Sequence, residues 1–233
     1  MFPIFILCLC VNLSYSYTVF ADIATNDWPD QDFDIAHADQ YFIEDKDFFT
    51  DKKEVKIQLY YESFCPGCME FETTEFKEVV EKLHEYIDIQ TYPYGNAKTY
   101  ERDGRIEFEC QHGPDECYGN KLHACALNII QNHTTALLFN SCMMDKSHRD
   151  GGSNDRAASK CGSKMAIDSK PIKACAKMAK GSELLKYYGE ETAKAKIIHV
   201  PYILINGHLY MIGNFLKVVC TYFSKPPPPC NEV

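Results

Sequence analysis

The clearest pattern in the chain is an alternation of apolar and polar residues that changes its period at residue 63. Residues 55–61 are apolar at every second position, which predicts a strand with one buried face: Val55, Ile57, Leu59 and Tyr61. After a break at Ser63-Phe64, apolar residues recur every three or four positions and predict an amphipathic helix to about residue 85: Phe76, Val79, Val80 and Leu83. A Cys-x-x-Cys sequence, residues 65–68, therefore lies where a strand turns into a helix.

Alternation resumes on both sides of a long middle segment. Residues 87–92 read as a second strand that ends in the turn sequence Pro93-Tyr94-Gly95-Asn96. A strand, helix and strand at this spacing predict two parallel strands joined by a right-handed crossover. Residues 197–210 predict a hairpin with its turn at Asn206-Gly207, and residues 214–223 predict a closing helix.

The middle segment, residues 98–189, is rich in cysteine and reads as helices and loops. Helices are expected over 122–130 and over 172–179, the second ended by Gly181, with a loop over 150–155. Six cysteines expected in structural disulfides leave many pairings open: Cys110, Cys117, Cys125, Cys142, Cys161 and Cys175. Cys220 and Cys230 flank the prolines at 226–229, and we expect a local bridge between them.

The N-terminal segments differ from the rest in composition. Residues 1–21 have no charged side chain and carry an apolar run too short to span a membrane, so they predict a signal peptide cleaved after residue 16 or 21. Residues 22–51 hold ten acidic residues and one base, a net charge of −9 that equals the charge of the whole chain. We interpret this segment as a leader or pro-segment. The acidic balance and the absence of a basic patch exclude a nucleic-acid partner.

Cysteine content indicates the compartment. Twelve cysteines are too many for an ordinary reduced cytosolic protein, and ten remain once the signal peptide is removed. This content predicts the secretory pathway. No nucleotide or flavin motif is present, so electrons for a redox reaction would come from outside the protein.

The Cys-x-x-Cys sequence has a specific chemistry at the start of a helix. Pro66 suits the first helical position, and Cys65 would cap the helix, facing unpaired backbone N–H groups and the positive end of the dipole. Both effects favour thiolate over thiol, so the pKa of Cys65 should lie below about 8.5. Cys68, one turn along, would resolve a mixed disulfide. The alternatives are a structural disulfide or half of a zinc site.

The order of elements, with a Val200-Pro201 pair ahead of the hairpin, resembles the thioredoxin fold. The resemblance implies an α/β, thioredoxin-like core over 52–97 and 190–225, a disulfide-rich, mostly helical insertion over 98–189, and a proline-rich tail over 226–233. It also implies that the Val200–Pro201 peptide bond is cis, faces the Cys-x-x-Cys and binds substrate through the Val200 backbone.

A second signature points to one particular family of proteins with this fold. Residues 110–125 fit the pattern Cys-Gln-His-Gly-x2-Glu-Cys-x2-Asn-x4-Cys, which resembles the gamma-interferon-inducible lysosomal thiol reductase family. That family implies a soluble reductase of protein disulfides at acid pH, in lysosomes, endosomes or outside the cell. Cys65 would attack, Cys68 would resolve, and a small thiol such as glutathione or cysteine would restore the pair. No resident cofactor, metal or membrane insertion is implied.

Several alternatives stay open beside this resemblance. The same residues could serve a disulfide isomerase or oxidase, or a secreted binding protein with a permanent Cys65–Cys68 bridge. Cys110, His112 and Cys117 have spacing that a zinc site could use, although an oxidising compartment favours bridges. Among the remaining histidines, His199 adjoins Val200-Pro201 and could tune the thiolate. Asn132 begins a glycosylation sequon.

Overall fold

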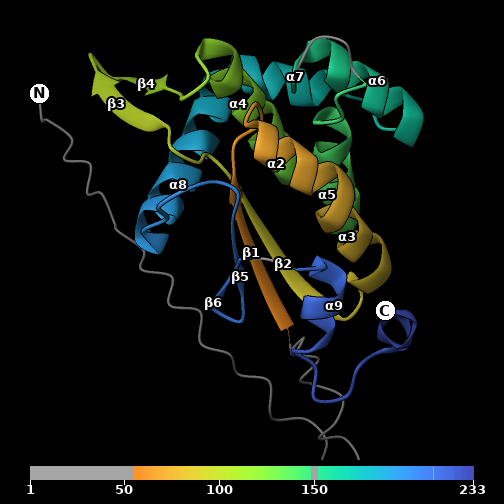
Figure 1. The fold of residues 1–233 in the computed structure, drawn as a ribbon. Helices are drawn as coiled ribbons and strands as arrows, with labels where there is room; N and C mark the ends of the chain where they lie inside the picture. The colour runs from red at the N-terminus through yellow and green to blue at the C-terminus, as the bar shows by residue number, and fades with distance from the viewer. Residues whose placement is uncertain (1–54, 148–151, 212) are drawn as a thin grey trace, which may run out of the picture. The chain divides into compact units, whose positions relative to one another are not determined.

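A four-stranded sheet forms the centre of the part of the chain that the structure describes (Figure 1). The structure is a computed structural model, and it describes residues 55–147, 152–211 and 213–233. The predicted signal peptide and acidic leader lie outside these residues. The strands are β1 (Val55–Tyr61), β2 (Ile87–Pro93), β5 (Tyr202–Ile205) and β6 (His208–Tyr210), in the order β2-β1-β5-β6.

Strand directions confirm the predicted crossover and hairpin. β1 and β2 are parallel, with Val55 opposite Ile87, whereas β5 runs antiparallel to both β1 and β6. Asn206 and Gly207 form the tight turn between β5 and β6, with φ of 49° and 80°. Two successive positive φ values are those of a mirror-image turn, which explains why Asn-Gly marks this hairpin in the sequence.

Helices cover the face of β1 that carries its fully buried side chains. The helical stretch after the Cys-x-x-Cys consists of α2 (Pro66–Phe71), a π-helical turn η3 (Glu72–Phe76) and α3 (Lys77–Leu83). The apolar positions that predicted this helix are all 0% exposed: Phe76, Val79, Val80 and Leu83. They join β1 and α9 (Phe215–Cys220) in one core. The predicted closing helix is therefore present but shorter, with Asn214 as its cap.

The π-helical turn is a departure from the regular helix that the periodicity predicted. Two threonine hydroxyls bond back to carbonyl oxygens four residues earlier, Thr73 to Met69 and Thr74 to Glu70, both at 2.6 Å. Such bonds compete with the regular α-helical ladder. Within this turn Glu72 is 1% exposed and accepts a hydrogen bond from Ser141 in α5 (His133–Met143). Burial raises the pKa of Glu72 to about 8.

The structure of the insertion differs from the sequence prediction at two points. It begins with an unpredicted hairpin, β3 (Lys98–Arg102) and β4 (Arg105–Glu109), whose residues are half-buried or exposed and carry little apolar signal. Five helices follow: α4 (Pro114–Ile129), α5 (His133–Met143), α6 (Asp155–Met165), α7 (Lys170–Lys177) and α8 (Ala179–Ala195). Gly181 does not end a helix, because it lies in the first turn of α8. A Cβ there would lie 2.6 Å from Cys175 O, so glycine permits close packing of α8 on α7.

The boundary expected at residue 189 falls inside α8, whose second half packs beside the sheet. Tyr188 meets Tyr92 edge to face, and Tyr92 stacks on Tyr60 at 4.4 Å between ring centroids. Tyr60 and Tyr92 lie one position away from Leu59 and Pro93, which point to the face that α3 covers, so α8 covers the opposite face of the sheet. The insertion is thus tied to the core on that face.

Disulfides join the helices of the insertion around a core of their own. Leu122, Phe139, Met143 and Ile172 are fully buried there. The pairings that the sequence left open are Cys110–Cys117, Cys125–Cys175 and Cys142–Cys161. The expected bridge between Cys220 and Cys230 is confirmed, and it joins α9 to the short helix η4 (Pro228–Glu232).

Replacing Glu72 by glutamine should stabilise the fold selectively at high pH. A carboxyl group whose folded pKa is raised to about 8 contributes stability below its unfolded pKa, and this contribution is lost as pH rises through about 8. Thermal midpoints of Glu72→Gln and the parent chain should be similar near pH 4.5. Near pH 8.5 the variant should melt about 5 °C or more above the parent.

All other groups titrate alike in the parent protein and in Glu72→Gln, so comparing their melting temperatures at the same pH removes the contribution of those groups. Glu81→Gln, an exposed glutamate on α3, is the matched control and should give no pH-dependent difference. An unchanged difference in melting temperature between the two pH values for Glu72→Gln would contradict the buried, protonated carboxyl group.

Candidate functional site

Cys65 caps helix α2 at the point where the chain leaves β1. Its backbone is extended, with ψ of 121°, Pro66 occupies the first helical turn, and the Cys68 N–H donates to Cys65 Sγ at 3.4 Å. Both Cys65 and Cys68 are free thiols. Cys65 retains 9% of its surface and Cys68 retains none, so an external disulfide can reach only the first sulfur.

The surroundings separate the acidities of the two thiols. The Cys68 thiol donates to Cys65, backbone N–H groups of Cys68 and Gly67 point at the sulfur, and His112 adds positive charge. Against the opposing effect of burial, these groups lower the pKa of Cys65 to about 6. Burial, with the hydrogen bond to Cys65, raises the pKa of Cys68 far above that of a free thiol. Cys65 is therefore the more acidic of the two thiols and ionises first, whereas Cys68 stays protonated.

Pro201 lies on the other side of the thiol. The Val200–Pro201 peptide bond is cis, as the resemblance implied, and Cys65 Sγ lies 4.0 Å from Val200 O. A Cβ on Gly67 would lie 3.5 Å from the Pro201 ring. His199, which the sequence suggested as a residue that could tune the thiolate, packs its ring on Tyr202, with ring centroids 5.3 Å apart. The histidine whose charge acts on Cys65 is His112, which the sequence marked only as a possible zinc ligand.

The 110–125 signature holds the loop that carries the thiols. Asn120 Oδ1 accepts a hydrogen bond from Ser63 N at 2.9 Å, and Ser63 Oγ donates to Glu116 O at 3.3 Å. Gly119 makes the close approach possible, because a Cβ there would lie 2.5 Å from Ser63 Oγ. Gln111 Oε1 accepts from Asn96 Nδ2 at 2.6 Å. These contacts position the end of β1, and with it Cys65, against α4.

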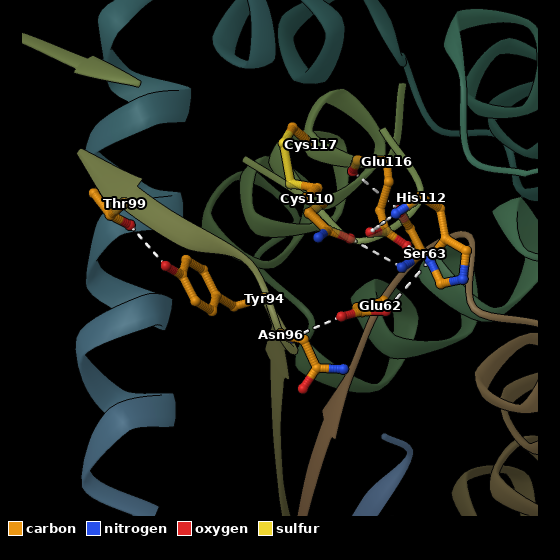
Figure 2. Close-up of a disulfide and its surroundings, with 10 residues drawn as sticks. Glu62, Ser63, Tyr94, Asn96, Thr99, Cys110, His112, Glu116 and Cys117 are labelled. Atoms are coloured by element: carbon orange, nitrogen blue, oxygen red, sulfur yellow. Dashed lines mark hydrogen bonds and ion pairs between the residues drawn. A yellow bond between two sulfur atoms is a disulfide. The ribbon is translucent and has the colours of Figure 1, made fainter. Parts of the chain in front are cut away.

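A cluster of Glu62, His112 and Glu116 lies behind this loop (Figure 2). His112 Nδ1 lies 2.6 Å from Glu116 Oε2 and 3.4 Å from Glu62 Oε2. Both glutamate side chains are fully buried, and that of His112 is 32% exposed. Burial raises the pKa of Glu62 to about 7, with the charges of Glu116 and Cys65 acting in the same direction. We call these three residues the Glu-His-Glu cluster.

The cluster also offers the donor atoms of a cation site. One atom from each residue lies within 4.8 Å of the other two. A direct hydrogen bond already joins His112 to Glu116, so we interpret the cluster as a group that shares protons. The zinc alternative with Cys110 and Cys117 is wrong, because these two cysteines form a disulfide that leaves no thiolate to bind a metal.

Asn132 lies at the surface, where it caps α5. Its side-chain oxygen accepts hydrogen bonds from the N–H and hydroxyl of Thr135 at 2.8 and 2.9 Å. The side-chain nitrogen, which a sugar would modify, makes no contact in this cap.

All eight cysteines outside residues 65–68 of the described chain are in disulfides: Cys110, Cys117, Cys125, Cys142, Cys161, Cys175, Cys220 and Cys230.

The fold and the paired thiols define a thioredoxin-like thiol–disulfide oxidoreductase. The fold is similar to that of reduced DsbA from Mycobacterium tuberculosis, with a TM-score of 0.56 and 13% identity, over 79% of this chain and 89% of that one. At this identity the likeness shows the fold alone.

Sequence comparisons show the family. The family model for gamma interferon inducible lysosomal thiol reductase matches residues 56–165. GILT-like protein 1 of Drosophila melanogaster is 32% identical over 77% of this chain and 79% of its own length. The gamma-interferon-inducible lysosomal thiol reductase of Carassius auratus is 33% identical over 76% of this chain and 72% of its own. The chain belongs to the gamma interferon inducible lysosomal thiol reductase family.

The Cys68 thiol should be a main cause of the acidity of Cys65. In the reduced protein, the rate of iodoacetamide labelling of Cys65, assigned by peptide mass spectrometry, should rise with a midpoint near pH 6. In Cys68→Ala the midpoint should move up toward about 8.5, because the hydrogen bond from the thiol is lost. A midpoint near 8.5 in the parent protein would contradict the assignment of Cys65 as a stabilised thiolate.

Proposed function

We propose that this protein reduces disulfide bonds in other proteins at acid pH, with Cys65 as the attacking thiolate and Cys68 as the resolving thiol. Cys65 attacks one sulfur of a substrate disulfide, forms a mixed disulfide and releases the other substrate sulfur, which takes up a proton. Cys68 then loses its proton and attacks Cys65 Sγ. The second substrate thiol leaves, and the two electrons given to the substrate leave a Cys65–Cys68 disulfide behind.

The observation that carries this proposal is the capped thiolate. An ordinary thiol with a pKa near 8.5 is ionised to about one part in three thousand at pH 5. With a pKa of about 6, Cys65 would be ionised to about one part in ten at that pH. This gain of roughly 300-fold in nucleophile concentration supports operation in an acidic compartment.

Substrate binding is assigned to the backbone of Val200 beside Pro201. An extended substrate segment would pair with Val200 as an added strand and so bring its disulfide to Cys65. The nearby groove has a volume of about 310 Å³, and besides the polar side chains of His199 and Glu75 its lining is mostly apolar and aromatic: Phe71, Pro201, Ile203, Tyr210 and Met211. Such a lining suits an unfolded or partly unfolded protein chain better than a small charged ligand.

The electrons for turnover are assigned to an external small thiol such as glutathione or cysteine, which would reduce the Cys65–Cys68 disulfide. The four disulfides support a route through the secretory pathway, ending in the lysosome, the endosome or outside the cell. The exposed cap residue Asn132 is a suitable glycosylation site on that route. Among the described residues, none of the helices is both long and apolar enough to span a bilayer.

Insulin reduction at about pH 5 tests the proposed activity. With a thiol reductant in excess, the parent protein should reduce insulin catalytically, and Cys65→Ser should lose at least about 100-fold, because serine cannot attack a disulfide. A double variant, Cys220→Ala with Cys230→Ala, removes a disulfide at the far end of the core and should retain activity. Full activity of Cys65→Ser, or no activity of the parent protein, would contradict the proposal.

A further inference from the structure

The Glu-His-Glu cluster has no role in the reaction as described so far, although the charge of His112 acts on the reactive thiol. We propose that His112, held by Glu116, and Glu62 are positioning residues that adapt the site to acid: there a His112 cation stabilises the ionised sulfur, and a protonated Glu62 adds no competing negative charge. This inference rests on the proposed function, since it concerns the same thiolate. The cluster links the insertion signature to the chemistry, because two of its members are signature residues.

Geometry fixes Glu62 in place. Its Oε1 accepts a hydrogen bond from Asn96 N at 2.6 Å, and the turn after β2 closes over the side chain. A Cβ at Gly95 would lie 2.2 Å from Glu62 Cγ, and the φ of 61° at Gly95 also favours glycine. Glu62 Oε2 is buried without a hydrogen-bond partner and faces His112 Nδ1. A buried carboxylate oxygen in that state is costly, so protonation of Glu62 relieves the site.

His112 is held by two bonds to one carboxyl group. Its backbone N–H donates to Glu116 Oε1 at 3.0 Å, and its ring Nδ1 lies 2.6 Å from Glu116 Oε2. Burial alone would lower the pKa of His112, but the hydrogen bond to Glu116 and the charges of Glu116, Glu62 and Cys65 raise it overall. The partly exposed ring exchanges protons with solvent, whereas Glu62 and Glu116 are sealed.

As the pH falls, His112 gains a positive charge and Glu62 loses a negative one, and both changes favour an ionised Cys65. Within the described residues, the charges that act on Glu62 are those of Glu116, Cys65 and His112. Those that act on His112 are Glu116, Glu62 and Cys65. The turn after β2 contributes only the uncharged Gly95 and the N–H of Asn96. In acid, the electrostatic surroundings of Cys65 therefore include a His112 cation and a neutral Glu62.

Above neutrality, ionised Glu62 adds a negative charge beside the sulfur. Glu62 and Cys65 each raise the other's energy when both are ionised, so they compete for one negative charge. The His112 cation, paired with Glu116, lowers the energy of the thiolate. The charge of ionised Glu62 also raises the pKa of Cys68 further, which keeps the resolving thiol protonated.

Opposite shifts in the acidity of Cys65 test this inference. The labelling midpoint of Cys65 should rise by about half a pH unit or more in His112→Gln, which means roughly threefold less thiolate at pH 5. It should fall in Glu62→Gln, because the carboxylate charge that Glu62 gains toward neutral pH is lost. His112→Lys, which restores a cation, should recover a low midpoint. Glu70→Gln makes the same chemical change at an exposed position of α2 and should leave the midpoint unchanged.

The pH profile of insulin reduction gives a second readout. His112→Gln should lose several-fold activity near pH 5 and little near pH 8, where the thiolate is abundant in any case. General damage to the site would instead move both variants in the same direction and at every pH. If His112→Gln does not fold, His112→Lys and Glu62→Gln still test the inference, because both should keep a low labelling midpoint for Cys65.

Failure of this inference is separable from failure of the proposed function. Midpoints within about 0.2 units of the parent in both His112→Gln and Glu62→Gln, in a protein that reduces insulin, would overturn the role of the cluster alone. A parent protein without reductase activity whose Cys65 still shows the two opposite shifts would overturn the function and leave the cluster standing.

Discussion

The structure depends on one interaction, the set of hydrogen bonds that converge on Cys65 Sγ at the start of α2. A sulfur at this position receives N–H groups that an α-helix leaves without partners, and the thiol of Cys68 adds a further donor. The energy of the thiolate is thus set by the Cys68 thiol together with the backbone N–H groups of the first helical turn. The sheet, the helix and the cis bond at Pro201 all serve to keep that geometry and leave one sulfur accessible.

The insertion contributes to the site as well as to stability. Its first helix, α4, supports the loop between β1 and α2 through Asn120 and Ser63, and a buried hydrogen bond of 2.7 Å joins Tyr61 in β1 to His123 in α4. The disulfide between Cys110 and Cys117 closes the short segment that presents His112 (Figure 2). The signature that identifies the family is therefore the part of the insertion that supports the loop leading to the two thiols.

Local patterns predicted the parts of the fold that depend on local physics. Alternation gave β1 and β2, three-and-four spacing gave the buried face of α3, and Asn206-Gly207 gave the last hairpin. The β3–β4 hairpin was missed because its side chains are largely exposed, although Asp103-Gly104, with φ of 49° and 73°, carried the turn signal. The Cys125–Cys175 and Cys142–Cys161 disulfides and the contact between Glu62 and His112 join residues far apart in sequence, which no local period can reveal.

Attack by Cys65 on a substrate in acid tests the central claim most directly. Reduced Cys68→Ser, whose hydroxyl can still donate a hydrogen bond to Cys65 but cannot resolve a mixed disulfide, would be mixed with insulin at about pH 5, quenched, and mapped by mass spectrometry. The account predicts an insulin chain joined through a disulfide to Cys65, because the resolving thiol is absent and the first intermediate accumulates. An insulin chain joined to another cysteine, or adducts that form at pH 8 but not at pH 5, would contradict it.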